Sequence, residues 1–169
     1  MMFKEIKPEQ LDRNIFDLIK NNWGVLTVDC DNKINAMTVS WVQMGQLWNK
    51  DVITVYVRPQ RYTYNHIIEK EDFSLAFFDG YKKELGYLGK ESGRDFDKLK
   101  KCGFTISKDG STPYINEANI IFIIKKLYSN TIKKDNFIDK SIIDYTYQEE
   151  DFHMGFVGEI VKILIKSDD

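Results

Sequence analysis

Hydroxyl side chains alternate with other residue types along residues 35–41 of the chain. This segment ends a run whose composition favours a β-strand. Because successive side chains of a strand point to opposite faces, Thr38 and Ser40 are predicted to share one face. That face is suited to a polar ligand.

A second polar segment, residues 58–63, carries Arg58, Arg61 and Thr63 where a strand is predicted to pass into a helix. Arginine offers planar, permanently charged donors that match phosphate oxygens. The free N–H groups of a helix beginning at Thr63 would add neutral donors and a favourable dipole. Pro59 has no N–H and restricts the turn. The segment therefore predicts a site for a phosphate monoester.

Each segment, taken singly, also has an ordinary structural interpretation. Thr and Ser alternate in many edge strands, and Arg-Pro-x-Arg occurs in many exposed loops. Only their combination points to a ligand site.

Strand candidates dominate the elements that must position these segments. They are rich in β-branched and aromatic residues and are separated by turn residues. The first two should pair as a hairpin through a turn at 31–33. The candidates are residues 24–29, 34–41, 52–57, 72–78, 120–128, 141–147 and 156–165.

Helix candidates are short by comparison. Helical spacing predicts an amphipathic N-terminal helix from Pro8 to residue 22, and a helix over 63–70 capped by Thr63. The charged stretch 81–101 is predicted to leave the sheet and to end in a short helix before Cys102. Strands at both ends of the chain, joined by short helices, favour a mainly β, mostly antiparallel barrel with appended helices.

The bulk composition limits the classes of protein that need to be considered. A chain of 169 residues, 43% hydrophobic, is sized for one domain spanning 1–169. With 24 Lys and Arg against 26 Asp and Glu, it has no general attraction for nucleic acid or an anionic membrane. Its longest apolar stretch, 120–124, is too short to span a membrane, and the N-terminus lacks a secretory signal, so we expect a cytoplasmic protein.

Other chemistry has little support in the sequence. Cys30 and Cys102 lack Cys-x-x-Cys spacing and are interpreted as ordinary reduced thiols. His66 and His153 have no companions at metal-ligand spacing, so no metal site is expected. Neither a catalytic dyad nor a Gly-x-Gly-x-x-Gly motif is present.

The two polar segments, in this order and spacing, resemble the flavin reductase family of FMN-binding split-barrel proteins. The matching residues are Asn-x-Met-Thr-x-Ser-Trp at 35–41 and Arg-Pro-x-Arg-Tyr-Thr-Tyr at 58–64. The resemblance continues through 71–75, through a Ser-Gly-Arg-Asp loop within 89–98, and through 151–160, where His153 precedes a Gly-Glu strand. It is poor over 125–147, and 120–124 lacks the Glu-Cys pair of many members.

The resemblance implies a six-stranded antiparallel Greek-key split barrel of the FMN-binding type, homodimeric, with FMN near the subunit boundary. It also implies a set of cofactor-binding residues and assigns parts of the ligand to some of them. Candidate phosphate or ribityl contacts are Thr38, Ser40, Arg58, Arg61 and Thr63, candidate ring neighbours are Asn35, Met37 and Trp41, and further candidates are Tyr62, Ser92, Arg94 and His153. For Arg94 a solvated loop, and for His153 a surface or interface position, remain alternatives.

The activity implied is that of an FMN-dependent oxidoreductase. NADH or NADPH would give a hydride to FMN, and the electrons would pass to another flavin, a redox partner protein or a small acceptor. Two alternatives remain open: a flavoredoxin-like electron carrier reduced by a partner protein, and a barrel that has lost flavin.

Overall fold

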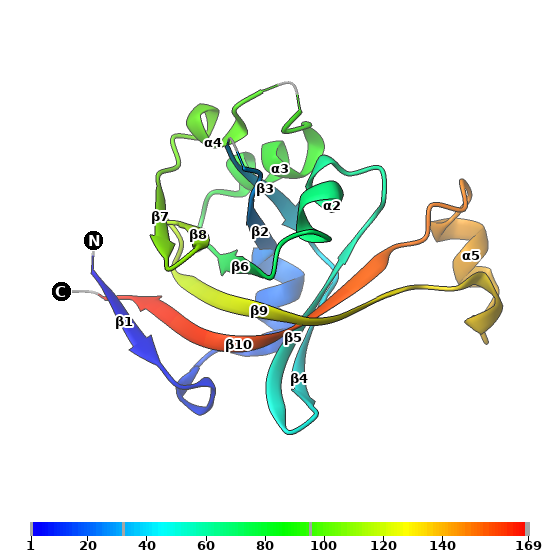
Figure 1. Ribbon diagram of the computed structural model, residues 1–169, viewed down its shortest axis with the longest axis horizontal. Helices are drawn as coiled ribbons and strands as arrows, with labels where there is room; N and C mark the ends of the chain where they lie inside the picture. Colours follow the sequence, from blue (N-terminus) through cyan, green and yellow to red (C-terminus); the bar gives the residue numbers. More distant parts are fainter. Residues whose placement is uncertain (1, 32, 95, 168–169) are drawn as a thin grey trace.

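An antiparallel sheet forms most of the computed structural model, which describes residues 2–31, 33–94 and 96–167 (Figure 1). Within these residues the sheet has eight strands in the order β3-β2-β6-β9-β10-β5-β4, with β1 paired to β10. A separate two-stranded sheet pairs β7 with β8. The strands are β1 (Phe3–Ile6), β2 (Gly24–Asp29), β3 (Ile34–Val39), β4 (Val42–Leu47), β5 (Lys50–Val57), β6 (Asp72–Phe77), β7 (Ile106–Asp109), β8 (Thr112–Ile115), β9 (Ile120–Thr131) and β10 (Met154–Lys166).

The mainly β, antiparallel class predicted from the sequence is confirmed. Six expected strands are present as β2, β3, β5, β6, β9 and β10, and β1 and β4 raise the sheet to eight strands. The β2–β3 hairpin is also confirmed, with Gly24 opposite Val39. Asn32, the middle residue of the turn predicted for this hairpin, lies outside the described residues.

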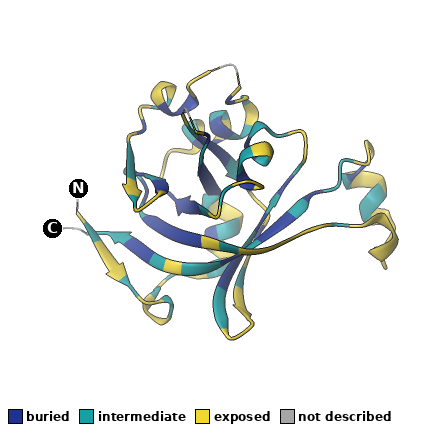
Figure 2. Ribbon diagram, viewed as in Figure 1, coloured by how far each residue is buried: buried dark blue, intermediate teal, exposed yellow. Residues whose placement is uncertain are grey.

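Two apolar clusters lie on the two faces of the sheet, because alternate side chains point to opposite faces. On β2, Leu26 belongs to the cluster that the curved sheet encloses, and Val25 belongs to the cluster on the other face. The enclosed cluster includes Phe73, Phe122 and Phe156, all buried. Figure 2 shows the buried residues concentrated in the strands.

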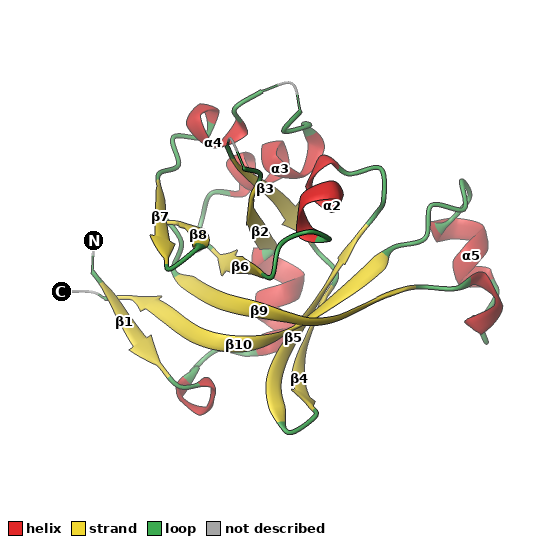
Figure 3. Cartoon of the chain, viewed as in Figure 1, coloured by secondary structure: helices red, strands yellow, loops and turns green. Residues whose placement is uncertain are grey.

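Short helices surround the sheet (Figure 3). Leu85 and Leu88 of α3 and Leu99 of α4 pack in the second apolar cluster, so these two helices cover the outer face of β2 and β3. The helices are α1 (Ile15–Asp17), α2 (Tyr62–Ile67), α3 (Lys82–Lys90), α4 (Lys98–Lys101) and α5 (Ser141–Thr146), with 3₁₀ helices η1 (Pro8–Gln10) and η3 (Lys134–Asn136) and a π-helical segment η2 (Leu18–Asn22). None of the helices in the described ranges is long and apolar enough to cross a membrane.

The prediction of a strand over 141–147 is wrong, because the segment forms α5. Just before the N-cap residue Lys140, Asp139 accepts hydrogen bonds from the N–H (3.0 Å) and hydroxyl (2.6 Å) of Ser141, the first residue of the helix. The partly or fully buried residues are 142, 143, 146 and 147, a helical rather than an alternating pattern. The helical signal was therefore present in the sequence.

The continuous N-terminal helix from Pro8 is also wrong. Pro8 does begin η1, but η1 ends at Gln10, and the next helix begins only after Asn14. The side chain of Asn14 accepts a hydrogen bond of 3.1 Å from the backbone of Asp17 and caps α1. A capping residue within the helical pattern thus divides it in two.

Strands β9 and β10 are the longest of the sheet and carry α5 away from it, as Figure 1 shows. Their pairing shifts register between Val157 and Gly158. A Cβ atom at Gly158 would lie 2.2 Å from Ile124 Cγ2 and 3.0 Å from the carbonyl oxygen of Lys125, so glycine is required there. The bulge lets the two strands bend and places residues 147–153 beside the start of β4.

Candidate functional site

A hollow of about 280 Å³ lies at the end of β3. We call it the Trp41 hollow. It brings together residues that are far apart in sequence, from β3, β5, the α2 approach, α3 and the start of β10. Its lining residues are Met37, Thr38, Val39, Ser40, Trp41, Tyr56, Arg58, Arg61, Gly89 and His153.

A smaller hollow of about 80 Å³, the Ser92 hollow, adjoins the first through Arg61. It is lined by Gln60, Arg61, Tyr62, Thr63, Lys90, Glu91, Ser92, Gly93 and Lys98. Of the twelve cofactor-binding candidates predicted from the sequence, all but Asn35 and Arg94 line one of these two hollows. Arg94 is exposed, with its guanidinium 5.8 Å from the centre of the Tyr62 ring.

Arg61, rather than Thr63, occupies the N-cap position of α2. The predicted capping role of Thr63 is therefore wrong. Thr63 is 2% exposed, and its hydroxyl accepts a hydrogen bond of 2.7 Å from Nδ2 of Asn35 on β3. This bond fixes the first turn of α2 against the sheet and turns Asn35 away from the Trp41 hollow.

Arg61 links the two hollows and carries a charge without a carboxylate partner. Its guanidinium donates a 2.5 Å hydrogen bond to the carbonyl oxygen of Gly89. Burial lowers the pKa of Arg61 below its ordinary value. No ion pair joins it to any carboxylate in the described residues.

Lys98 is a second cation at the Ser92 hollow, and sequence reasoning did not single it out as a binding residue. It is 4% exposed, and Nζ donates hydrogen bonds to the carbonyl oxygens of Leu88 (2.9 Å) and Glu91 (3.0 Å). Burial, followed by repulsion from Arg61, lowers the pKa of Lys98 to about 8. The available signal was its position at the end of the loop that contains Ser92 and Arg94.

Arg58 differs from Arg61 because its charge is already neutralised. It forms an ion pair with Asp151 and donates a 3.1 Å hydrogen bond to the carbonyl oxygen of Thr146. Its guanidinium also lies 5.7 Å from the centre of the Tyr147 ring. Arg58 therefore connects the Trp41 hollow to residues 132–152, which lie between β9 and β10 and which we call the α5 lobe. It does not line the Ser92 hollow.

His153 forms a buried side of the Trp41 hollow. It is 8% exposed, its ring centre lies 4.5 Å from that of Trp41, and Nδ1 lies 3.0 Å from the hydroxyl of Tyr147. Burial, with the positive charge of Arg58 as a second cause, lowers the pKa of His153 to about 4, while Asp151 opposes the shift. The imidazole is therefore neutral at pH 7.

The hydroxyl residues of the first segment have different surroundings. Thr38 donates a 2.5 Å hydrogen bond to the carbonyl oxygen of Leu85 in α3, so its hydroxyl ties β3 to that helix. Ser40, just beyond β3, is exposed, and Trp41 is 43% exposed. Ser40 and Trp41 are thus the more accessible of the polar and aromatic groups at this end of β3.

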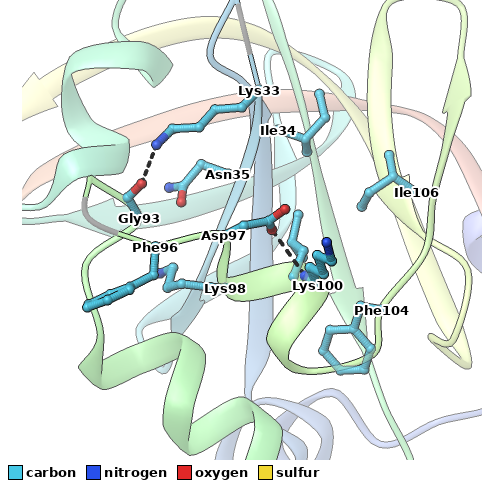
Figure 4. A pocket seen from close by; sticks show the side chains of 11 residues that line it. Lys33, Ile34, Asn35, Gly93, Phe96, Asp97, Lys98, Lys100, Phe104 and Ile106 are labelled. Atoms are coloured by element: carbon cyan, nitrogen blue, oxygen red, sulfur yellow. Dashed lines mark hydrogen bonds between the residues drawn. The ribbon is translucent and has the colours of Figure 1, made fainter.

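A third hollow, of about 400 Å³, shares Gly93 and Lys98 with the Ser92 hollow, and Figure 4 shows the side chains that line it. A Cβ atom at Gly93 would lie 1.8 Å from Oδ1 of Asn35, so this loop can only approach β3 with glycine there. Lys33 donates a 2.5 Å hydrogen bond to the Gly93 carbonyl oxygen and fixes the loop from above, as the dashed line shows. Asn35 lines this third hollow and not the Trp41 hollow.

Metal-binding geometry is absent from the part of the chain that the structure describes, where no three His, Cys, Asp or Glu side chains are grouped to hold an ion. The chemistry available at the two adjoining hollows is instead that of cations, neutral donors and aromatic rings. Such a set recognises a ligand that is anionic at one end and planar at the other.

The sequence matches the family described as "Flavin reductase like domain" over residues 17–169. The chain therefore belongs to the flavin reductase-like family, as its motifs indicated. No curated protein matches the sequence.

Solved structures of this family share the fold. Flavoredoxin from Methanosarcina acetivorans superposes with a TM-score of 0.68 at 23% identity, covering 97% of this chain and 76% of that one. An FMN-binding protein from Thermus thermophilus gives 0.67 at 19% identity, covering 98% and 83%. The NADH:FAD oxidoreductase SgcE6 from Streptomyces globisporus C-1027 gives 0.63 at 14% identity, covering 86% and 74%. At these identities the likeness establishes the split-barrel fold alone.

Proposed function

We propose that this protein binds FMN across the Trp41 and Ser92 hollows, with the phosphate in the Ser92 hollow, and works as a flavin reductase-like oxidoreductase. The observation that carries the proposal is the pair of cations Arg61 and Lys98, which line one small hollow without a carboxylate partner among the described residues. Arg61 is half-buried and Lys98 is buried, and a cation removed from water is stabilised when an anion joins it. Glu91, which also lines the hollow, attracts Lys98 but forms no ion pair with it in the described residues.

The remaining lining of the Ser92 hollow fits a phosphate monoester. The hydroxyls of Ser92 and Thr63 and the backbone at the start of α2 are neutral donors close to the two cations. Because Asn35 already donates to the Thr63 oxygen, the Thr63 proton is left to donate to a ligand oxygen. The hollow is small, which suits a compact anion better than a ring.

The Trp41 hollow fits the planar part of a flavin. Trp41 supplies an aromatic face, and Met37 supplies an apolar contact. His153 supplies a polar group, and Tyr56 of β5 forms another wall of the hollow. Arg61 lines both hollows, so one ligand reaches from the aromatic residues to the cations. The FMN-binding protein and the flavoredoxin that share the fold support this choice of ligand.

A flavin held by these residues would supply the redox chemistry of the proposed reaction, which is hydride transfer from NADH or NADPH and transfer of the electrons to an acceptor. The protein's own residues bind, orient and shield. Arg61 and Lys98 anchor one end, Trp41 and Met37 exclude water from the ring, and neutral His153 offers a hydrogen bond without adding charge. No side chain need act as an acid or base in this scheme.

We also propose a homodimer in which a second copy covers the open side of the Trp41 hollow. An apolar groove of about 840 Å³ shares Ser40 with that hollow and is lined by Phe16, Ile19 and Met44 among others. Phe16 is 85% exposed, which is costly for an aromatic ring in solution. Equilibrium sedimentation checks this, and a monomer at micromolar concentration would contradict it.

Two measurements test the proposed function. Purified protein loaded with FMN should be yellow and release FMN on denaturation, and colourless protein that cannot be reconstituted would overturn flavin binding. The loaded protein should then lose its flavin absorbance when mixed with NADH or NADPH without oxygen. Bound FMN that neither nucleotide bleaches would instead support an electron carrier reduced by a partner protein.

A further inference from the structure

Tyr147 belongs to the stretch 125–147, where the motifs of the family are poorly matched, yet it packs against two residues that line the Trp41 hollow, Trp41 and His153. It directly follows α5 and is 2% exposed. Its hydroxyl lies 3.0 Å from Nδ1 of His153, and its ring packs edge-on to Trp41 at 6.5 Å and to His153 at 5.6 Å. The α5 lobe thus supplies a polar group to the buried side of this hollow.

In its hydrogen bond with His153, the Tyr147 hydroxyl is the donor. Burial raises the pKa of Tyr147, with the His153 backbone bond and Arg58 opposing, so the phenol keeps its proton at pH 7. In the described residues, the one side-chain hydrogen-bond partner of this hydroxyl is Nδ1 of His153, at 3.0 Å. A buried hydroxyl proton needs an acceptor, so the hydroxyl donates to Nδ1.

This donation determines the tautomer of the imidazole. A neutral histidine carries one ring proton, and a nitrogen that accepts a hydrogen bond cannot hold it. The proton of His153 therefore lies on Nε2. Nε2 makes no hydrogen bond to another described residue, and His153 lines the Trp41 hollow, where this N–H is the polar group of the ring that remains available.

We propose that Tyr147 is a positioning residue that holds His153 as the Nε2–H tautomer, so that His153 offers a hydrogen-bond donor to a ligand acceptor in the Trp41 hollow. The acceptor is a carbonyl oxygen or an electron-rich ring nitrogen, as on the pyrimidine edge of a flavin. The identity of the ligand rests on the proposed function, whereas the tautomer does not.

The tautomer is measured directly in flavin-free protein by two-bond ¹H–¹⁵N correlation of the histidine rings at pH 7. Wild-type protein should show protonated Nε2 and bare Nδ1 for His153, and His66, the other histidine of the chain, serves as the internal reference. In Y147F we expect a mixture of both tautomers, because Nδ1 loses its donor. A wild-type Nδ1–H signal, or an unchanged spectrum in Y147F, would overturn the proposal.

Tyr145 provides a matched control, since it lies two residues away and is 70% exposed. Y145F should leave the His153 signals unchanged. Y147F retains the buried ring and loses only the hydroxyl, and the wild-type spectrum alone decides the tautomer even where Y147F folds poorly.

A second readout concerns the loaded protein. Y147F should lower the midpoint potential of bound FMN relative to Y145F and wild type, because a fixed donor favours the more negatively charged reduced ring. Bound FMN with the same potential in all three proteins would overturn the ligand half of the proposal. Protein that binds no FMN but shows the Nε2–H signal would overturn the proposed function and leave the role of Tyr147 standing.

Discussion

Asn35 Nδ2 donates a 2.7 Å hydrogen bond to Thr63 Oγ1, and both side chains are almost completely buried. The bond joins β3 to the first turn of α2, two elements whose sequences are 28 positions apart. It fixes the distance between the strand that ends at the Trp41 hollow and the helix that borders the Ser92 hollow. The two halves of the proposed binding site are therefore held by one buried polar contact.

Substitutions at Asn35 and Thr63 should each lower the free energy of unfolding, and their effects should not be additive. We expect N35A and T63A each to lower the free energy of unfolding by about 1–3 kcal/mol, because each leaves a buried polar partner unsatisfied. The double variant should lose less than the sum, with a coupling of about 1 kcal/mol measured by urea unfolding. Asn65, exposed on the same helix, is the control: N65A should change stability by less than about 0.5 kcal/mol. Additive losses would show that the bond contributes nothing.

Removing the Arg61 guanidinium should affect the phosphate end of the ligand and not the ring end. We predict that R61A weakens FMN about 10- to 100-fold, since a charge-assisted contact is lost, and weakens riboflavin by less than about threefold. Calorimetric titration of flavin-free protein gives both values. R13A is the matched control, because Arg13 pairs with Asp79 at 3.2 Å outside the hollows. Equal weakening of both flavins would refute the assignment of Arg61 to the phosphate.

The pKa of about 8 for Lys98 gives FMN binding a pH dependence. An anion is bound more tightly by the protonated amine, so FMN affinity should fall as pH rises through about 8. K98M, which removes the charge and keeps much of the volume, should bind FMN weakly both below and above that pH. Riboflavin, which has no phosphate, should show no such fall, and a parallel fall for riboflavin would contradict the role of Lys98.

His153 should make the fold less stable in mild acid. Its pKa is depressed to about 4 in the folded state, against an ordinary value of 6.5, so between these values the unfolded chain binds the proton more readily. Stability contributed by neutral His153 is present above about pH 6.5 and is lost as pH falls toward 4. H153Q, which keeps a side-chain amide near the position of Nε2, should show a smaller loss of unfolding free energy between pH 6.5 and 4.5. A slope identical to wild type would contradict the burial of a neutral imidazole.

The sequence predicts the strands and both polar segments because their signals are local. The strand-favouring composition of 24–29 and 34–39 on either side of a polar turn is visible without tertiary information, and so is the Arg-Pro-x-Arg turn before α2. The strand expected over 141–147 fails because Ile142, Ile143 and Tyr147 suit a strand by composition but have helical spacing.

Long-range contacts account for what the sequence could not reveal. In the sequence, Lys98 is indistinguishable from a surface lysine. Its amine is buried because α4 packs against α3, where it donates to the carbonyl oxygens of Leu88 and Glu91. Arg58 and Arg61 look equivalent in the motif, but Asp151, far along the chain, neutralises Arg58 alone. The contact between Tyr147 and His153 spans only six positions, but it forms where the chain turns back from α5 into β10, a turn that the sequence did not predict.

The comparison of FMN with riboflavin on wild-type protein tests the central claim most directly. Calorimetric titration of flavin-free protein at pH 7 should show FMN bound at least about tenfold more tightly than riboflavin, because only FMN carries the phosphate that Arg61 and Lys98 are placed to bind. Equal affinities for the two flavins, or no binding of FMN, would contradict the account.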